Sequence, residues 1–350
     1  MPPPDERSGH PPPLSIGGFL GLEIAGAGSE PGAAFDAGDH LFFRNARAAF
    51  AHLLAVLDAP RVWLPAYICP EMATAAAGAG RVVLFYPVGR TFEADVAFLE
   101  GRLRARDAVV GVDYFGAADP TGAFATLAPR FPNVHWVQDR AQALWPSATA
   151  PWGDYLLYSP RKVVGVADGG ALVSRRGPLR LPTWMESTPV DGLYPALMRL
   201  EDPQGHRREV WFPAYQKAEA EMNAEPVAMS RLSSGLLGRF DTTALADRRR
   251  ANAAALLSRI SARAPIAADR LLVGSPLGVP VLTKDAAATA SAMAARGVYC
   301  ARHWASLPSD ASQFPQEHAL SRELLTLPCD HRYGVDDMLR IIEVLELCDG

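Results

Sequence analysis

The chain has 350 residues, of which 49% are hydrophobic, so it is long enough to bury a large core and to form two domains. Its formal net charge of -4 argues against a nucleic-acid-binding protein, because such proteins usually carry an excess of basic residues. No apolar run approaches the ~18 residues that cross a membrane, and the N-terminus lacks the basic and apolar regions of a signal peptide, so we expect a cytoplasmic protein without a membrane partner.

Residues 1–15 are rich in proline, and we expect them to be disordered. Beyond them, short apolar runs alternate with alanine-rich stretches of helical length, which is typical of a parallel sheet covered by helices on both faces. The expected strands cover residues 61–64, 82–86, 108–112, 134–137, 155–158 and 171–174.

The second half of the chain changes in character. Residues 178–225 are richer in proline and aromatic residues and less periodic, so we expect a lid, helices and connections there. A long arginine-rich helix is expected from Asp241, and residues 277–282 predict a further strand. We therefore place a boundary near residue 245, between a large domain of residues 16–245 and a smaller α+β domain of residues 246–350.

Five aromatic residues stand out in the middle region: Trp184, Tyr194, Trp211, Phe212 and Tyr215. Aromatic residues in irregular segments often form interfaces or pocket lids, which favours contact with a second subunit. The alternative is that these side chains close the hydrophobic underside of their own subunit.

Other kinds of site find little support. The four cysteines are scattered without a C-x-x-C pair, which indicates neither a disulfide framework nor a zinc site. The eight histidines show no H-x-x-x-H or H-E-x-x-H spacing, so we expect no metal. No G-x-S-x-G elbow and no G-x-G-x-x-G loop follows an expected strand.

Polar residues follow two of the expected strands at their carboxyl ends. Asp139 and Gln142 come after residues 134–137, and Ser159 and Lys162 come after residues 155–158. Lys162 is one of only three lysines in the chain, which uses arginine for most of its cations. Arginine cannot replace an amine that forms an imine, because its guanidinium group stays protonated.

The other two lysines, Lys217 and Lys284, lie in polar runs and are expected to be solvated charges. Lys162 instead follows a buried-looking strand and precedes the glycine pair Gly169-Gly170, so it is the candidate reactive residue. A surface lysine just past a strand is the alternative interpretation.

The segment around these residues resembles the DegT/DnrJ/EryC1/StrS group of sugar aminotransferases. That group carries an E-D-x-A-Q/H-A-L segment, a G-D-x-x-x-x-S strand, a lysine and a G-D-G-G turn. The matching residues here are Asp139-Arg140-Ala141-Gln142-Ala143-Leu144, Gly153-Asp154 with Ser159, Lys162, and Asp168-Gly169-Gly170. The resemblance runs from about residue 42 to the C-terminus. Serine and lysine are three residues apart rather than five, which indicates a divergent branch.

The resemblance implies an α/β fold of the type I PLP-dependent transferases, which is aspartate-aminotransferase-like, with a mainly parallel central sheet in the large domain. It also implies pyridoxal 5'-phosphate (PLP) as the cofactor. Lys162 would hold the cofactor as a Schiff base, and Asp139 would salt-bridge the pyridine nitrogen and favour the protonated ring. Gln142 would hydrogen-bond the ring hydroxyl, and Ser159 would help to hold the phosphate.

Two further cofactor contacts follow from the resemblance. Ala46 and Arg47 stand where the group has a loop that turns into a helix, so their backbone N–H groups would bind the phosphate. The alternative is an ordinary amphipathic helix opening. Tyr67 lies in a segment similar to the group's P-x-F/W segment and would stack on the pyridine ring, unless it merely caps the end of the sheet. Cys69 is expected to face away, and Asp113 replaces the histidine usual in the group.

The smaller domain carries three candidate substrate residues, Arg302, His303 and Arg332, in segments that resemble the closing segments of the group. They would face a carboxylate or diphosphate, or else be structural charges at a domain seam. The group commonly adds a phosphate contact from an asparagine of the partner subunit. That asparagine is absent here, and Ser230 or Arg231 stands in the corresponding stretch.

The resemblance implies an aminotransferase that moves an amino group from a glutamate-like donor to a keto sugar or another keto acceptor, with Lys162 as the proton carrier. It also implies a two-fold homodimer with the pockets at the interface. Two alternatives stay open. One is a PLP enzyme of another reaction type, such as elimination, decarboxylation or carbon–carbon lysis, and the other is a non-catalytic binding protein that keeps the fold.

Overall fold

The computed structural model describes residues 15–24, 38–117, 122–145, 149–180, 182 and 185–349, and the statements below concern these residues. Residues 1–14 and Trp184 lie outside the described residues. Of residues 1–15, which we expected to be disordered, only Ser15 is described.

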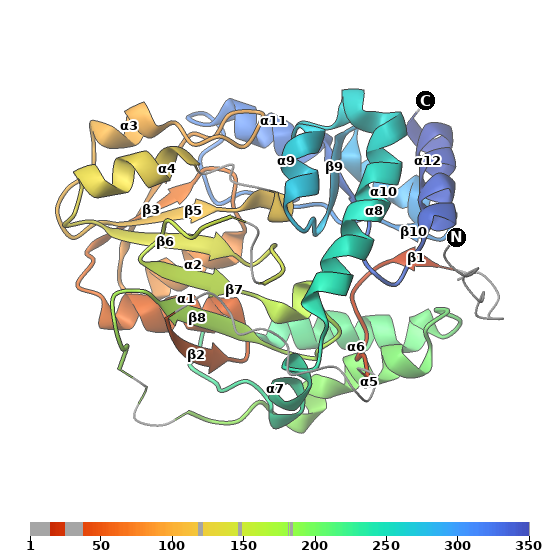
Figure 1. Ribbon diagram of the computed structural model, residues 1–350, viewed down its shortest axis with the longest axis horizontal. Helices are drawn as coiled ribbons and strands as arrows, with labels where there is room; N and C mark the ends of the chain where they lie inside the picture. The colour runs from red at the N-terminus through yellow and green to blue at the C-terminus, as the bar shows by residue number, and fades with distance from the viewer. Residues whose placement is uncertain are drawn as a thin grey trace, which may run out of the picture.

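A seven-stranded sheet forms the centre of the larger part of the described chain (Figure 1). Its strands are β2 (Asp39–Phe43), β3 (Arg61–Pro65), β4 (Val82–Tyr86), β5 (Ala108–Val112), β6 (His135–Arg140), β7 (Tyr155–Tyr158) and β8 (Gly170–Ser174). They follow the order β2-β8-β7-β6-β5-β3-β4. Strands β3 to β7 run parallel to their neighbours, whereas β8 is antiparallel to both β7 and β2.

All six strands that were expected in this region are confirmed. The clearest difference in bounds is at β6, which begins at His135 and continues through Asp139 to Arg140. Strand β2 was not predicted, because only Leu41 and Phe43 of its residues are buried and the run is too short to show a clear alternation.

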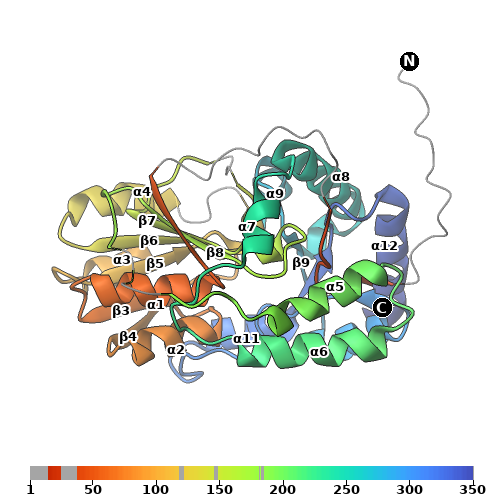
Figure 2. The same ribbon diagram turned by 90° about the horizontal axis from the view of Figure 1, so that it is seen from below.

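Helices cover both faces of this sheet. They are α1 (Ala46–Val56), α2 (Pro70–Gly78), α3 (Val96–Glu100) and α4 (Gly122–Leu127). Helices α1 and α2 lie on one side of the sheet and α4 on the other (Figure 2). Ala48 and Ala49 are fully buried, and their small side chains allow α1 to pack closely. Asn45 caps this helix, because its side chain accepts a hydrogen bond from the Ala48 N–H at 2.8 Å.

The C-terminal part begins with the long helix α8, which is capped by the Asp241 side chain. Its elements are α8 (Thr242–Ile260), α9 (Ala268–Val273), β9 (Gly278–Leu282), α10 (Ala286–Ala294), β10 (Val298–Tyr299), α11 (Pro315–Glu323), β11 (Leu324–Pro328) and α12 (Val335–Asp349). Strands β9 and β11 form an antiparallel pair. The helix and strand expected after Asp241 are thus confirmed. The boundary proposed near residue 245 falls inside α8 and stays a prediction.

Residues 16–24, which the sequence assigned to the large domain, pack partly on the C-terminal part. Strand β1 (Ile16–Gly17) pairs in parallel with β10. The Gly17 N–H donates to the Tyr333 hydroxyl at 2.8 Å. Gly17 has φ +91°, and a Cβ atom there would lie 2.1 Å from the backbone oxygen of Tyr299, so only glycine fits this close pairing.

The helices expected in the middle region are confirmed. The region contains α5 (Tyr194–Glu201), α6 (Arg208–Glu221) and α7 (Arg231–Leu237). The interpretation of the aromatic segment as irregular is wrong, because Tyr194 opens α5 and Trp211, Phe212 and Tyr215 lie on α6. Pro213 inside α6 obscured the helix, since proline usually ends one.

The aromatic side chains of α6 pack largely within their own subunit. Trp211 is only 3% exposed, and Phe19 stacks on Tyr215 with the ring centroids 4.0 Å apart. Tyr194 differs, because it is 51% exposed. The alternative interpretation therefore describes Trp211 and Tyr215 better than contact with a partner does.

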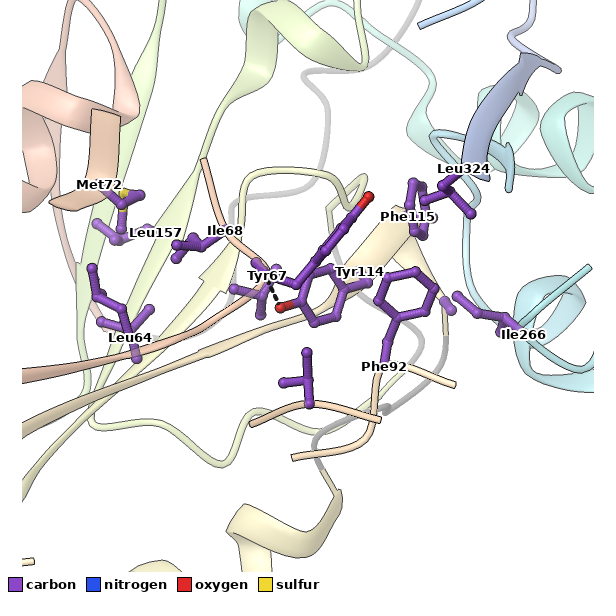
Figure 3. Close-up of a cluster of buried hydrophobic side chains, with 14 of the residues drawn as sticks. Leu64, Tyr67, Ile68, Met72, Phe92, Tyr114, Phe115, Leu157, Ile266 and Leu324 are labelled. Atoms are coloured by element: carbon purple, nitrogen blue, oxygen red, sulfur yellow. Dashed lines mark hydrogen bonds between the residues drawn. The ribbon is translucent and has the colours of Figure 1, made fainter. Parts of the chain in front are cut away.

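One hydrophobic core extends from the sheet into the C-terminal part. Figure 3 shows an aromatic cluster within it, in which Tyr67, Tyr114, Phe92 and Phe115 lie side by side near Leu324 of β11. The Tyr114 hydroxyl donates to the Tyr67 backbone oxygen at 2.5 Å. Both parts of the chain thus contribute to the packing behind the site described next. Among the described helices, none combines the length and the apolar composition that a membrane crossing requires.

Candidate functional site

The candidate residues gather where parallel strands end. Asp139 is the second-last residue of β6, and Ser159 directly follows β7. A single helical turn, η3 (Pro160–Lys162), then carries Lys162. Because the two strands are parallel neighbours, their carboxyl ends bring Asp139 and the turn to the same edge of the sheet.

Asp139 is buried, and its carboxylate oxygen Oδ1 accepts a hydrogen bond from the Ala141 N–H at 2.8 Å. Burial raises the pKa of Asp139, and the positive charge of Lys162 partly opposes that rise. The Lys162 ammonium therefore lies within electrostatic reach of Asp139. The structure brings together the two residues that carry the sequence-based hypothesis.

Gln142 offers an unpaired donor at the same edge. Its Oε1 accepts a hydrogen bond from the Phe115 N–H at 2.6 Å. Its Nε2 is buried and has no hydrogen-bond partner among the described residues. A buried unpaired amide costs about 1–3 kcal/mol, so this position suits a ligand with an acceptor oxygen. The predicted hydrogen bond from Gln142 to the PLP ring hydroxyl fits this observation.

The predicted phosphate residues meet at a glycine turn. Asn45 forms an isolated parallel bridge with Gly169. A Cβ atom on Gly170 would lie 2.3 Å from the Ala46 nitrogen, and Gly169 has φ +141°, a conformation that favours glycine. Gly170 therefore lets the start of α1 pack directly against the glycine turn. Ser159 is 3% exposed at the beginning of that turn.

Arg47 is held by α2 and by the end of α6. Its Nη1 donates to the Met222 backbone oxygen, and its Nη2 lies 4.0 Å from the Glu71 carboxylate. Its Nε is buried without a partner among the described residues. The roles of Ala46, Arg47 and Ser159 in phosphate binding stay predictions.

Two residues at the start of α2 join the site, and sequence reasoning gave neither of them a role there. The Cys69 thiol donates to the Glu71 carboxylate. Burial raises the pKa of Cys69 to about 11, while the charge of Lys162 opposes the rise. Cys69 therefore lies within electrostatic reach of Lys162, although it was expected to face away. No local motif marks Cys69 or Glu71, because α2 brings them to Lys162 only in the folded chain.

Tyr67 is fully buried in the aromatic cluster (Figure 3). Its ring lies 5.4 Å from that of Phe92 and 5.5 Å from that of Trp304, between centroids. Its hydroxyl donates to the His303 backbone oxygen, which ties the end of β3 to the C-terminal part. Stacking of Tyr67 on a cofactor ring stays a prediction.

A cavity of about 600 Å³ lies beside Lys162, between the C-terminal part and the helices α5 and α6. Lys162, His303 and Arg332 line it, whereas Arg302 is not among its lining residues. Burial, reinforced by the charge of Lys162, lowers the pKa of His303 to about 3, so His303 is neutral at pH 7. Its Nδ1 lies 2.9 Å from the Thr326 hydroxyl.

Arg332 is engaged in a strong ion pair. Its Nε and Nη2 donate to the two oxygens of Asp330 at 2.7 and 3.0 Å. Burial alone would raise the pKa of Asp330, but Arg332 and Arg249 lower it to about 2. Arg332 also donates to the Phe19 backbone oxygen at 3.2 Å. This geometry suits the alternative in which Arg332 is a structural charge at the seam between the two parts.

Two other positions have partners within the subunit. Asp113 pairs with the Arg140 guanidinium, Nε to Oδ2, at 3.0 Å in the buried interior. The Ser230 hydroxyl donates to Asp168 at 2.6 Å and caps α7. No cluster of three or more His, Cys, Asp or Glu side chains in the described chain could hold a metal ion.

Neither a protein-family model nor a curated protein matches the sequence. Solved structures do match the fold. DesV of S. venezuelae, in complex with a ketimine intermediate, is 19% identical with a TM-score of 0.63, over 89% of this chain and 85% of DesV. The aminotransferase TlmJ from Streptoalloteichus hindustanus is 18% identical with a TM-score of 0.65, over 94% of this chain and 98% of TlmJ.

A DegT DnrJ EryC1 StrS aminotransferase from Brucella abortus is 15% identical with a TM-score of 0.61, over 89% of this chain and 86% of that chain. These similarities cover most of the chain and confirm the expected fold class, the α/β fold of the type I PLP-dependent transferases.

Proposed function

We propose that this protein is a PLP-dependent aminotransferase related to the DegT/DnrJ/EryC1/StrS group, which moves an amino group from an amino acid to a keto acceptor. One observation carries the proposal. A buried carboxylate, Asp139, lies within electrostatic reach of Lys162 at the carboxyl edge of a parallel sheet. The Nε2 of Gln142 at the same edge, which has no hydrogen-bond partner among the described residues, supports it.

The residues divide the chemistry among them. When bound, PLP supplies an electron sink that stabilises a carbanion at the α-carbon of the substrate. The Lys162 amine would attach the cofactor and, once released, carry the proton between carbon atoms of substrate and cofactor. Asp139 would place its negative charge against the pyridine nitrogen, and a cation there would favour the ionised carboxylate despite its burial.

Other residues of the chain would shape the site around these groups. Gln142 would donate its free Nε2–H to the ring oxygen. His303 stays neutral beside Lys162, so it adds no charge that would compete with the amine. Burial of Tyr67 and Tyr114 excludes water from the inner wall of the site.

The test begins with the cofactor link. We expect the purified protein to take up PLP with an absorbance band in the visible, and borohydride reduction followed by peptide mapping to place the pyridoxyl group on Lys162. Lys162→Ala should be colourless or hold PLP only loosely. Lys217→Ala and Lys284→Ala are matched controls and should behave as the wild type. A pyridoxyl group on Lys217 or Lys284 would overturn the assignment.

Addition of glutamate separates the reaction types. Conversion of the visible band by glutamate, with the amino group recovered in a keto acceptor, supports transamination. Carbon dioxide release or elimination without amino transfer would favour another PLP reaction. A protein that never develops the band would be a binding protein that keeps the fold. Candidate keto sugars, added to protein carrying pyridoxamine phosphate and followed by mass spectrometry, test the acceptor.

The proposal extends to assembly and location. We propose a cytoplasmic homodimer whose pockets are completed at the interface. Exposed apolar side chains near α5 support such an interface, because Val190 is 66% exposed, Tyr194 51% and Met198 40%. Light scattering that finds only a particle of monomer mass with full activity would contradict the shared pocket.

A further inference from the structure

We infer that Arg208 forms an anion-binding subsite in the cavity beside Lys162, which recognises a carboxylate or phosphate group of the substrate. The inference deepens the proposed function and rests on it for the identity of the ligand as substrate. Arg208 is the first residue of α6 and is half-buried, and its side chain lines the same cavity as Lys162.

The charge of Arg208 is not compensated by an acid. In the described chain, no carboxylate lies within ion-pair distance of its guanidinium group. The other arginines on the cavity wall are satisfied differently. Arg161 donates to both oxygens of Glu219 at 2.6 and 3.0 Å, and Arg332 is paired with Asp330. Arg249 donates to the Val163 backbone oxygen at 2.8 Å.

Aromatic rings hold the Arg208 guanidinium without neutralising it. Its central carbon lies 3.6 Å from the ring centroid of Tyr299 and 4.2 Å from that of Phe212. Cation–π contacts of this kind use the face of the guanidinium group. The five N–H donors lie in the plane of the group. The Tyr299 hydroxyl accepts a hydrogen bond from this group, and stacking leaves the remaining donors able to bind an oxyanion in a forked geometry.

The position of Arg208 joins the two sides of the cavity. Tyr299 belongs to β10 of the C-terminal part, whereas Phe212 lies on α6. Phe19 and Tyr215, stacked at 4.0 Å, add an apolar wall to the same cavity. A substrate would thus place its anionic group at Arg208, rest its body on aromatic rings and direct its reacting carbon towards Lys162.

Two substrate groups share this chemistry: the carboxylate of an amino-acid donor and the diphosphate of a nucleotide-linked sugar. Glutarate and pyrophosphate serve as probes of the two sources. Each is titrated calorimetrically into the purified protein and into protein reduced with borohydride in the presence of PLP, which cannot turn over. Tighter binding of glutarate would identify the donor carboxylate, and tighter binding of pyrophosphate would identify the diphosphate.

We expect Arg208→Gln to weaken binding of the preferred anion at least about tenfold, the loss expected for a charge-assisted hydrogen bond. Arg208→Lys, which keeps the charge but loses the planar fork, should fall between the wild type and the glutamine variant. Arg207→Gln is the matched control, because Arg207 is the neighbouring residue, is exposed and is not among the lining residues. It should bind both anions as the wild type does.

Equal binding by Arg208→Gln, or no measurable binding of either anion to the wild type, would overturn the inference. Loss of PLP from Arg208→Gln would also overturn it, because Arg208 would then contact the cofactor phosphate. Failure of PLP to attach to Lys162 would count against the proposed function instead. If PLP does not attach to Lys162, the titrations on untreated protein still decide whether Arg208 binds an anion.

Discussion

Replacing Asp139 by asparagine removes one negative charge from the buried end of β6 and changes little else. The asparagine side chain can still accept the hydrogen bond that Asp139 receives from the Ala141 N–H at 2.8 Å. Opposite charges at close range shift a pKa by ~1–3 units, or roughly 1.4–4 kcal/mol. Without that energy the pyridine nitrogen is less protonated, so we expect turnover to fall by about tenfold to a thousandfold.

The assay measures turnover with glutamate and a keto acceptor, together with PLP content and the unfolding temperature of each variant. PLP should remain attached in Asp139→Asn, because Lys162 and the phosphate contacts are unchanged. Asp113→Asn is a matched control, since Asp113 is also a buried acid that follows a strand of the same sheet and pairs with Arg140. That variant should lose about 3–5 kcal/mol of stability, because the buried Arg140 charge is no longer balanced by the Asp113 carboxylate.

The two variants should therefore differ in kind. Asp139→Asn loses turnover at nearly constant stability, and Asp113→Asn loses stability. Unchanged turnover in Asp139→Asn would show that Asp139 only shapes the turn after β6. A fall in its unfolding temperature as large as that of Asp113→Asn would refute the reasoning as well.

Two further predictions concern stability. The folded-state pKa of Asp330 is lowered to about 2 from 3.8, so its ionised form contributes roughly 2 kcal/mol that is present above about pH 4 and lost as the pH falls towards 2. Asp330→Asn should therefore be less stable than the wild type in urea at pH 7, and a difference that does not shrink at pH 3 would contradict this. Gly170→Ala should destabilise the protein and weaken PLP binding, because the new Cβ would lie 2.1 Å from the Asn45 carbonyl carbon. Gly235→Ala, in α7 with open space around it, should instead add about 0.5–1 kcal/mol, and equal thermal shifts in the two variants would contradict the crowding at Gly170.

The strands of the sheet could be predicted because their signal is local. Each central parallel strand is buried on both faces, so β5 and β7 appear in the sequence as continuous apolar runs. The placement of Asp139 near Lys162 followed from the same logic, since parallel neighbours end at one edge. The bounds of helix α6 could not be predicted, because Pro213 lies inside it and only Trp211 and Ala218 of its residues are buried.

Long-range contacts were the part that local patterns could not supply. Arg208 received no role, because its cavity is formed by α6 together with β10, far away in the chain. Nothing near Arg208 in the sequence distinguishes it from the exposed Arg207. Glu71 and Cys69 were missed for the same reason. A charge that no acid compensates can be recognised only when all the spatial neighbours of the side chain are known.

The pairing of β1 with β10 has a consequence for the order of folding. The Gly17 N–H and the Tyr333 hydroxyl that it contacts are 316 positions apart in the chain. On a ribosome, residues 15–24 are therefore made long before the strand that they join, and they must wait until nearly the whole chain has emerged. Contacts of such high sequence separation form slowly, because closing a long loop costs conformational entropy before the contact contributes any stabilising free energy.

Phe19 belongs to this late segment and lines the cavity beside Arg208. The wall of the cavity can thus be completed only at the end of synthesis. A nascent chain that already has its seven-stranded sheet would still lack a finished ligand pocket. Ligand binding should accordingly mature after the secondary structure does when the unfolded protein is diluted out of denaturant.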